Sequence, residues 1–361
     1  ITNSDSIRIY APAQLIALAD SFRVYMHDSV VVASVVAAGD TFDLRMKVKN
    51  DSGYVVTNLI SNPFTPDSSG AGGIDLLSGP IVQKTRLDSG EATHIVWTYR
   101  AKDNGLGSVN FSVRAQGLDS TNENTLISSN TVTRLLTIRH ATEDTILTLA
   151  GLTTFNDTIL VRNTEVLEVV VKDRFSNVVP NDSVRYRVYA GTGGFNDTSR
   201  TTVDSVTVTN AEGRASLRLY TSTVPVTNTV VAKLLTTSDD SVVFTIVTLP
   251  RAISSLGMVV ASSWTAGVNE NVAVTAYDEF GNVAVNATSN IQLTPIVSSS
   301  VQFAPVSGLL ALSSGMATFG AQDTVAKSFM QIKASESGVG TQVTSQDLSV
   351  VHNRAKRFAD T

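Results

Sequence analysis

A sequence pattern that recurs along the chain limits what this protein can fold into. Val169 to Pro180 reads VVVKDRFSNVVP and Val274 to Val285 reads VTAYDEFGNVAV, so Asp173 and Asp278 stand 105 residues apart. Landmarks that return in a fixed order indicate homologous units, because each unit builds the same elements in the same sequence. The repeat therefore predicts a tandem array of similar domains.

Two further landmarks follow each turn. A glycine, one residue and an alanine lead into a strand at Gly213 in NAEGRASLRLYTS and at Gly315 in SSGMATFG, 40 and 37 residues after the two aspartates. The same step occurs at Gly90 in DSGEATH, and Asn50 in MKVKNDSGYVV stands 40 residues before it. A later alternating strand carries an alanine in each unit, at Ala115, Ala232 and Ala334. Three ordered landmarks predict three units.

The composition identifies the fold class. Charged residues make up 16% and hydrophobic residues 42% of the 361 residues, and Val, Thr, Ser and Asn fill every segment. Short alternating strands separated by frequent turn residues are typical of immunoglobulin-like β-sandwiches. We expect an all-β chain of tandem immunoglobulin-like β-sandwiches arranged end to end. The expected units are residues 13–138, 139–250 and 251–352, with a long loop at 61–80 and very short linkers.

The ends of the chain resemble the boundaries between units. Residues 1–12 are similar to a closing strand and are predicted to belong to a preceding or neighbouring domain, and 353–361 to a linker toward a further domain. Three explanations for residues 1–12 stay open: a window from a longer tandem chain, a strand that completes a sandwich in an adjacent subunit, or a strand folded back on this chain.

The turn itself has a physical explanation. An aspartate side chain accepts a backbone N–H two residues later, and glycine or asparagine supplies a left-handed conformation that closes the turn. Phe175 and Phe280 are expected to fold back onto the sandwich end where two units meet. The predicted turn residues are Asn50, Gly53, Asp173, Asn177, Asp278, Gly281 and Asn282.

Residues 141–351, with the Asp-x-x-Gly/Ser-Asn turn, the later Gly-x-Ala step and the closing strand with its alanine, resemble the bacterial immunoglobulin-like domains of invasin and intimin type. The first unit has Asn50 in place of the aspartate and is more similar to cell-adhesion-related sandwich domains of bacterial surface proteins. Both resemblances imply that the chain belongs to a stalk or an adhesive surface structure, with a mechanical or spacing role and no catalytic one.

The composition also excludes several classes of protein. A net charge of -5 and a pI near 5.4 provide no basic surface for nucleic acid, and the absence of cysteine rules out disulfides and thiolate sites. The four histidines show no zinc-ligand spacing. The longest apolar run, residues 29–39, is too short to span a membrane as a helix, and we expect a buried strand there.

Several residues are candidates for binding or crosslinking. Asp119, Asn122, Glu123 and Asn124 offer clustered oxygen ligands for calcium, although a solvated hairpin explains them equally well. No other cofactor is expected. Lys172 is a candidate for an isopeptide crosslink, although an exposed strand position explains it equally well. The segment 61–80 is expected to contact a neighbouring subunit or matrix component, or else to be a mobile loop; its interaction residues are Asn62, Pro63, Phe64, Pro66 and Asp67.

The two tryptophans receive different predictions. Trp97 alternates with Ile95 and Tyr99 on one face of a strand and is expected in a core. Trp264 stands just before a strand and is expected at a domain junction or binding surface.

The sequence favours a non-enzymatic, extracellular or cell-surface bacterial protein, part of a fibre, filament or adhesin stalk. Its expected partners are copies of itself or further immunoglobulin-like domains, with cell-surface or matrix polysaccharide as another candidate. The alternatives are a glycan- or protein-binding adhesin module and a noncatalytic region of a larger secreted enzyme. An exposed aromatic or acidic cluster would favour the first alternative.

Overall fold

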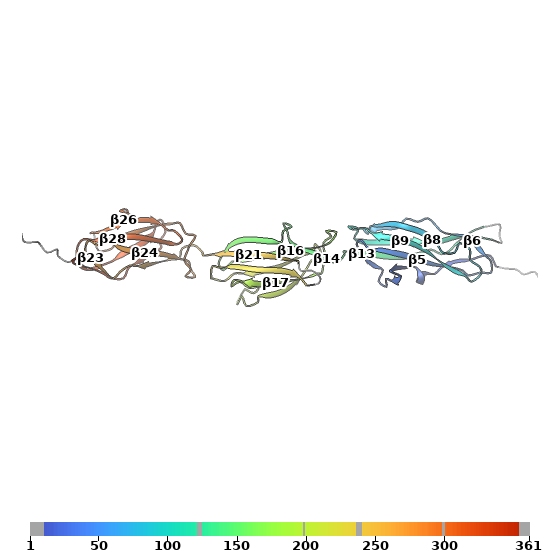
Figure 1. Ribbon diagram of the computed structural model, residues 1–361, viewed down its shortest axis with the longest axis horizontal. Coiled ribbons are helices and arrows are strands. Elements are labelled where there is room, and N and C mark those ends of the chain that lie inside the picture. The colour runs from blue at the N-terminus through green and yellow to red at the C-terminus, as the bar shows by residue number, and fades with distance from the viewer. Residues whose placement is uncertain (1–10, 121–124, 198, 236–239, 298–299, 354–361) are drawn as a thin grey trace, which may run out of the picture.

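Strands build nearly all the regular structure. The computed structural model describes residues 11–120, 125–197, 199–235, 240–297 and 300–353, where the one helical element is a 3-10 turn at Ala19–Ser21. Buried apolar residues of these segments form three separate clusters, within residues 13–138, 146–246 and 256–350. Figure 1 shows the three sandwiches in a row in chain order, with unit 1 and unit 3 at opposite ends. The chain is thus an all-β tandem of immunoglobulin-like sandwiches, as predicted.

Unit 1 combines one large sheet with two smaller ones. The large sheet has the order β3-β2-β5-β9-β8, with β1 beside β5. The opposite layer consists of β4-β13-β10-β7 and β12-β11-β6. The bounds are β1 (Leu15–Ala17), β2 (Arg23–Met26), β3 (Ser29–Val30), β4 (Val35–Ala37), β5 (Thr41–Asn50), β6 (Val56–Ser61), β7 (Asp67–Gly70), β8 (Ile74–Val82), β9 (Ala92–Ala101), β10 (Gly107–Val113), β11 (Ala115–Asp119), β12 (Thr125–Ser128) and β13 (Val132–Arg139).

Unit 2 is the simplest of the three. Its sheets have the orders β14-β16-β19 and β15-β21-β20-β17-β18. The bounds are β14 (Glu143–Thr148), β15 (Thr154–Leu160), β16 (Thr164–Asp173), β17 (Ser183–Ala190), β18 (Asp204–Val208), β19 (Arg214–Tyr220), β20 (Thr227–Leu234) and β21 (Ser241–Leu249).

Unit 3 repeats this plan with interrupted strands. Its layers are β22-β24-β28-β26 on one side and β23-β32-β29 with β27-β25-β30-β31 on the other. The bounds are β22 (Ser255–Val259), β23 (Ser263–Thr265), β24 (Glu270–Tyr277), β25 (Asn290–Pro295), β26 (Val301–Ala304), β27 (Leu309–Ala311), β28 (Met316–Asp323), β29 (Lys327–Met330), β30 (Ile332–Glu336), β31 (Gln342–Thr344) and β32 (Leu348–Val351).

All three units share one crossing of the chain between the layers. The chain changes sheet after β3 in unit 1 and after the first strand in units 2 and 3. The next strand then pairs in parallel with the last strand of the unit: β4 with β13, β15 with β21 and β23 with β32. This arrangement brings the start and the end of each unit to opposite ends of the sandwich. Units built in this way can follow one another in a line.

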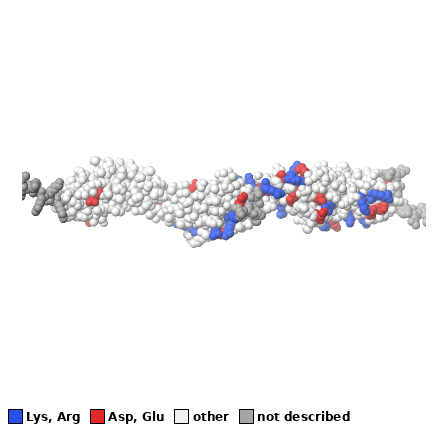
Figure 2. Space-filling model, in the orientation of Figure 1, with Lys and Arg blue, Asp and Glu red and all other residues white. Residues whose placement is uncertain are grey.

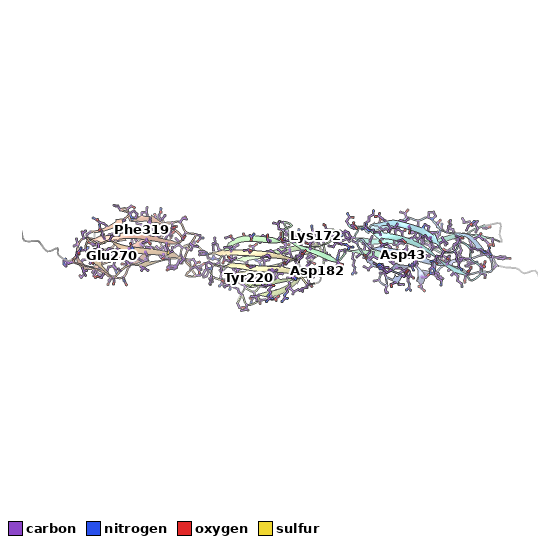
Figure 3. The ribbon with its side chains drawn as sticks, in the orientation of Figure 1. Asp43, Lys172, Asp182, Tyr220, Glu270 and Phe319 are labelled. Atoms are coloured by element: carbon purple, nitrogen blue, oxygen red, sulfur yellow. The ribbon has the colours of Figure 1, made fainter. Side chains whose placement is uncertain are left out.

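Alternation explains the cores. In β5 buried and half-buried residues alternate from Phe42 to Asn50, and Leu44 lies opposite Trp97 of β9. Trp97 is 2% exposed, so its predicted place in the core is confirmed. The landmark alanines of the repeat are fully buried as well, and Phe319 occupies the equivalent interior of unit 3 (Figure 3). The small side chains of these alanines allow the two sheets of each sandwich to lie close together.

Two sequence predictions about unit 1 are wrong. Residues 29–39 do not form one buried strand: β3 and β4 are separate, Val32 between them is 92% exposed and Ser34 has φ 49°. The chain leaves one sheet for the other here, so the strand has to break. The segment 61–80 is not one long loop, because β7 pairs with β10 and β8 with β9. Both are edge strands, which tolerate the Pro and Gly residues of this segment as irregularities in register.

The prediction for Trp264 is also wrong. Its side chain is 1% exposed inside the core of unit 3, and its indole Nε1 donates to the carbonyl of Ala261 at 3.0 Å. The parallel pairing of β23 with β32 turns this residue inward, which the position before a strand did not indicate.

Candidate functional site

The repeated turn closes the end of β16 in unit 2. Asp173 is 2% exposed, and its Oδ1 accepts the backbone N–H groups of Phe175 and Asn177, both at 2.9 Å. Its Oδ2 accepts the N–H of Ala141 at 2.8 Å and the side-chain amide of Asn177 at 2.9 Å. Ser176 takes the left-handed position with φ 69°. One carboxylate therefore fixes both the turn and the entry of the chain into the unit.

Unit 3 repeats this geometry after β24. Asp278 is 2% exposed, its Oδ1 accepts the N–H groups of Phe280 and Asn282 at 2.9 Å, and its Oδ2 accepts the N–H of Arg251 at 3.1 Å. The amide of Asn282 donates to Oδ2 at 3.0 Å, and Gly281 has φ 82°. The same hydrogen bonds therefore recur 105 residues later.

The asparagine of each turn also reaches the preceding unit. Asn177 Nδ2 donates to the carbonyl of Asp103 at 2.6 Å, and Asn282 Nδ2 donates to the carbonyl of Thr223 at 2.7 Å. Both carbonyls lie in the loop that follows the corresponding strand of the preceding unit, β9 in unit 1 and β19 in unit 2. The two junctions are thus made by the same pair of loops.

Aromatic and cationic side chains complete the junctions differently. A Cβ atom placed on Gly39 of unit 1 would lie 2.6 Å from Cζ of Phe175, so the ring packs directly against this glycine. Phe280 is 36% exposed and lies beneath the guanidinium of Arg251, 5.9 Å from the ring centroid. Phe175 also lies under a guanidinium, that of Arg174, 4.7 Å from its ring centroid. Phe175 therefore contacts the neighbouring unit, whereas Phe280 stays partly exposed and its described ring contact is with Arg251.

Arg251 provides a further cross-unit contact at the second junction. Its Nε donates to the carbonyl of Val161 at 3.1 Å, and its guanidinium pairs with Glu279 at 3.5 Å. A single arginine at the start of unit 3 therefore contacts both a loop of unit 2 and the turn of unit 3.

The hydrogen bonds keep both aspartates ionised. Burial alone would raise the pKa of Asp173, but the bonds donated by Asn177, Ala141 and Phe175 outweigh it and hold the pKa below its ordinary value. The same balance lowers the pKa of Asp278, where Asn282 and Arg251 donate. At neutral pH both junctions therefore contain a fully hydrogen-bonded carboxylate.

Unit 1 organises the corresponding turn differently. Asn50 is fully buried; its Nδ2 donates to the carbonyls of Leu87, at 3.1 Å, and Tyr54. The N–H of Ser52 approaches Asn50 Oδ1 at 3.4 Å. Gly53 is exposed and is not one of the glycines with positive φ. The amide of Asn50 thus tethers the turn to its own unit.

Asp119, one of the calcium candidates, makes in unit 1 one of the hydrogen bonds that the turn aspartate makes in units 2 and 3, the bond to the entering chain. It is 1% exposed, and its Oδ2 accepts the N–H of Ala13 at 2.8 Å, near the entry to unit 1. The other three candidates, Asn122, Glu123 and Asn124, lie outside the described residues. Within the described segments no group of three or more His, Cys, Asp or Glu side chains is placed to hold a metal ion.

The residues of the predicted interaction loop lie along the surface of unit 1. Phe64 packs edge-on against Trp97 with 5.6 Å between ring centroids, and Asn62 and Pro63 line a surface cavity beside it. Pro66 is half-buried, and Asp67 begins β7. Phe64 is therefore part of the packing of unit 1.

Lys172, which is labelled in Figure 3, stands immediately before Asp173 in β16. Its backbone pairs with Val178 across the turn. Its proposed crosslink stays a prediction. In the described parts of the chain, no helix is both long and apolar enough to span a bilayer.

The sequence analysis missed several residues of the junctions, among them Gly39, Arg251, Asp103 and Thr223. Thr223 contributes a backbone carbonyl, which no side-chain pattern reveals. Gly39 did carry a signal, because a glycine directly after an apolar run indicates a turn. Its φ in the structure is 81°.

Comparisons with known proteins give partial likenesses. No family model matches the chain, and no curated protein matches it. Among solved structures, the Escherichia coli adhesin FdeC is 12% identical with a TM-score of 0.43, covering 95% of this chain and 100% of that one. The Yersinia pseudotuberculosis adhesin InvE is 18% identical with a TM-score of 0.27, covering 54% of this chain and 56% of that one.

Domains 4–9 of the surface layer protein SbsC are 11% identical with a TM-score of 0.25. That match covers 95% of this chain and 48% of the SbsC chain, so this chain spans about half of it. Identities and TM-scores this low do not indicate what this chain binds, and the invasin and intimin resemblance stays a prediction.

Proposed function

We propose that this chain is a non-enzymatic spacer segment of an extracellular or cell-surface bacterial protein, in which three sandwiches are held in line as a stiff stalk or fibre. The observation that supports this most directly is the recurrence of one junction: a turn asparagine of each following unit donates to a loop carbonyl of the unit before it. Hydrogen bonds across both junctions, in addition to short linkers, restrict bending.

The linkers themselves leave little freedom. β13 ends at Arg139 and β14 begins at Glu143, while β21 ends at Leu249 and β22 begins at Ser255. The entry residues, Ala141 and Arg251, are each bonded to the buried aspartate of the next turn. A linker tied at its midpoint cannot act as a flexible hinge.

Binding is the second candidate function. The charged side chains visible in Figure 2 gather over unit 1 and the adjoining part of unit 2, and few appear on unit 3. This distribution leaves an adhesin module centred on unit 1 as the alternative, with a protein or polysaccharide partner.

Small-angle X-ray scattering of the whole chain tests the spacer function. We expect a maximum dimension that matches three sandwiches in line, and a shorter average dimension for the double variant Asn177→Ala/Asn282→Ala. Asn196→Ala is the control, because the bonds described for its side chain, to Ser199 and Thr202, both lie within unit 2. Wild-type scattering typical of freely jointed beads would contradict the proposal.

A further inference from the structure

Units 1 and 2 contact the next unit through a left-handed residue that is hydrogen-bonded to a neighbouring loop. The same backbone arrangement, called here the frame, is present at the end of unit 3 that faces away from unit 2. In each unit a left-handed residue follows the short parallel strand; these residues are Gly39 with φ 81°, Arg162 with φ 59° and Gly267 with φ 78°. Each left-handed residue donates its N–H to a carbonyl at or just after the end of an equivalent strand: Gly39 to Ala101 at 3.1 Å, Arg162 to Ser222 at 2.8 Å and Gly267 to Asp323 at 2.8 Å.

This frame is occupied in the first two units. Gly39 receives the ring of Phe175, and the carbonyls of Val161 and Arg162 receive the guanidinium of Arg251. In unit 3 no atom of the described residues, apart from the glycine and its two chain neighbours, lies within 4 Å of where a Cβ on Gly267 would stand. Among the described residues, therefore, none covers the glycine on which a further aromatic ring would pack.

The acceptor loop is also repeated. Unit 2 reads Ser222-Thr223-Val224 where unit 3 reads Asp323-Thr324-Val325. The N–H of Val224 donates to Ser222 Oγ at 3.1 Å, and the N–H of Val325 donates to Asp323 Oδ1 at 2.8 Å, so both loops are held in the same way. Since Thr223 provides the carbonyl that Asn282 reaches, Thr324 holds the corresponding carbonyl in unit 3.

The loop in unit 3 is fixed in advance of any contact. Asp323 is fully buried and also accepts hydrogen bonds from Ser300 Oγ, at 2.8 Å, and from Lys327 Nζ. Val325 beside it is 53% exposed, much as Val224 is 51% exposed. A preformed loop loses little conformational freedom when a partner binds.

We propose that this face of unit 3, formed by Gly267, Thr324 and Val325 and called here the distal face, docks a further β-sandwich unit. That unit follows β32 directly and presents an Asp-x-Phe-Ser/Gly-Asn turn like those of units 2 and 3. The proposal rests on the spacer function, because it extends the same junction by one step.

The occupant is a unit of this kind and not the front of a second copy. The corresponding turn of unit 1 has Ser52 where the phenylalanine is needed and Tyr54 where the asparagine is needed, and Asn50 is already bonded within unit 1. The turns of units 2 and 3 are engaged in their own junctions.

The test inserts a second copy of residues 250–351 between Val351 and His352 of the full chain. The chain has no cysteine, so spin labels can be placed at introduced cysteines alone. The exposed residues Ser216 of β19 and Thr318 of β28 each stand three residues after the repeat glycine. The pair Ser216→Cys/Thr318→Cys spans the native junction, and Thr318→Cys in both copies spans the new one.

Pulsed electron paramagnetic resonance should give equally narrow distance distributions across the native and the new junction. Gly267→Ala should broaden the new one, whereas the control Gly338→Ala, at a similar φ of 82° and also without neighbours, should not. If the distance distribution is narrow across the native junction but broad across the new one, this inference alone is overturned. If the distributions across both junctions are broad, the spacer function is overturned as well. If the natural chain dimerises and Gly267→Ala abolishes the dimer, the distal face binds a second copy of the chain in place of a tandem unit. That result would also overturn the inference.

Discussion

At the scale of single residues, two buried aspartates link the folded turn of a unit to the contact of that unit with the preceding one. Asp173 and Asp278 each accept hydrogen bonds from three backbone N–H groups and one asparagine amide. A carboxylate with its acceptor sites filled stays charged although it is buried. The same asparagine then reaches the preceding unit, so the turn that completes one unit also joins it to another.

The pKa of Asp278 predicts an acid-sensitive unit 3. Because its folded-state pKa is lowered, the aspartate stabilises the unit above its unfolded pKa of about 3.9, and this contribution is lost as the pH falls through the folded-state pKa. Asp278→Asn should lower the free energy of unfolding by about 1.5 to 3 kcal/mol at neutral pH. The difference from the wild type should shrink below about pH 4. Thermal unfolding across this range measures it.

Asp347→Asn is the control for this prediction, because Asp347 is exposed and bonds only to Gln331 among the contacts described. A loss of stability for Asp278→Asn that is equally large at acidic and neutral pH would show that the charge of Asp278 contributes nothing.

Gly281 makes a prediction about backbone conformation. With φ 82° it occupies a region that β-branched residues avoid, so Gly281→Val should destabilise unit 3 by about 1 to 3 kcal/mol. Gly340→Val is the control, because Gly340 also has open space around it but no positive φ. Equal melting temperatures of unit 3 in the two variants would contradict the strain argument.

At the scale of elements, alternation and turn chemistry predicted most of the architecture. The interior face of β9 follows directly from the spacing of Ile95, Trp97 and Tyr99. The break in residues 29–39 could not be predicted, because the chain changes sheet there and only the tertiary pairing of β4 with β13 requires it. The inward position of Trp264 depends on the parallel pairing of β23 for the same reason.

The candidate site was predictable only in part. The turns were visible because aspartate and asparagine are needed at fixed spacing, but their partners across the junction are backbone carbonyls of Asp103 and Thr223. Any residue can provide a backbone carbonyl, so the identity of the accepting residue cannot be predicted from the sequence. The edge strands β7 and β8 were hidden by Pro and Gly residues that usually mark loops.

The segment around β7 supports a prediction about packing. Phe64 lies beside Trp97 and Phe111, with 5.6 and 6.5 Å between ring centroids. Because Phe64 is only half-buried, Phe64→Ala should destabilise unit 1 by less than a full core truncation, about 1 to 3 kcal/mol. The exposed neighbour Thr65→Ala should leave the melting of unit 1 unchanged. An unaffected unit 1 in Phe64→Ala would identify the segment as a free loop.

At the scale of the whole molecule, the account depends on how firmly neighbouring units are joined. The first junction combines the hydrogen bond from Asn177, the packing of Phe175 on Gly39 and a tied linker. The second combines hydrogen bonds from Asn282 and Arg251 to unit 2 with a tied linker. Single contacts of this size are individually weak, and their combination across a short linker is what restricts bending.

Gly39 tests the first junction. In Gly39→Ala the new methyl group would lie 2.6 Å from Phe175 Cζ, so the ring has to move and unit 2 should reorient more freely. Gly90→Ala in the same unit is the control, since its φ of 77° imposes the same strain but no atom lies nearby. Nitrogen-15 relaxation should show faster independent tumbling of unit 2 only in Gly39→Ala. Identical tumbling in both variants would exclude Phe175 from the junction.

The most direct test of a stiff rod is the measurement of residual dipolar couplings for all three units of the weakly aligned full chain. If the junctions hold the units in line, one alignment tensor fits the couplings of unit 1, unit 2 and unit 3 together. Separate tensors of different magnitude for the three units would show that they move independently, and would contradict the function proposed for this chain.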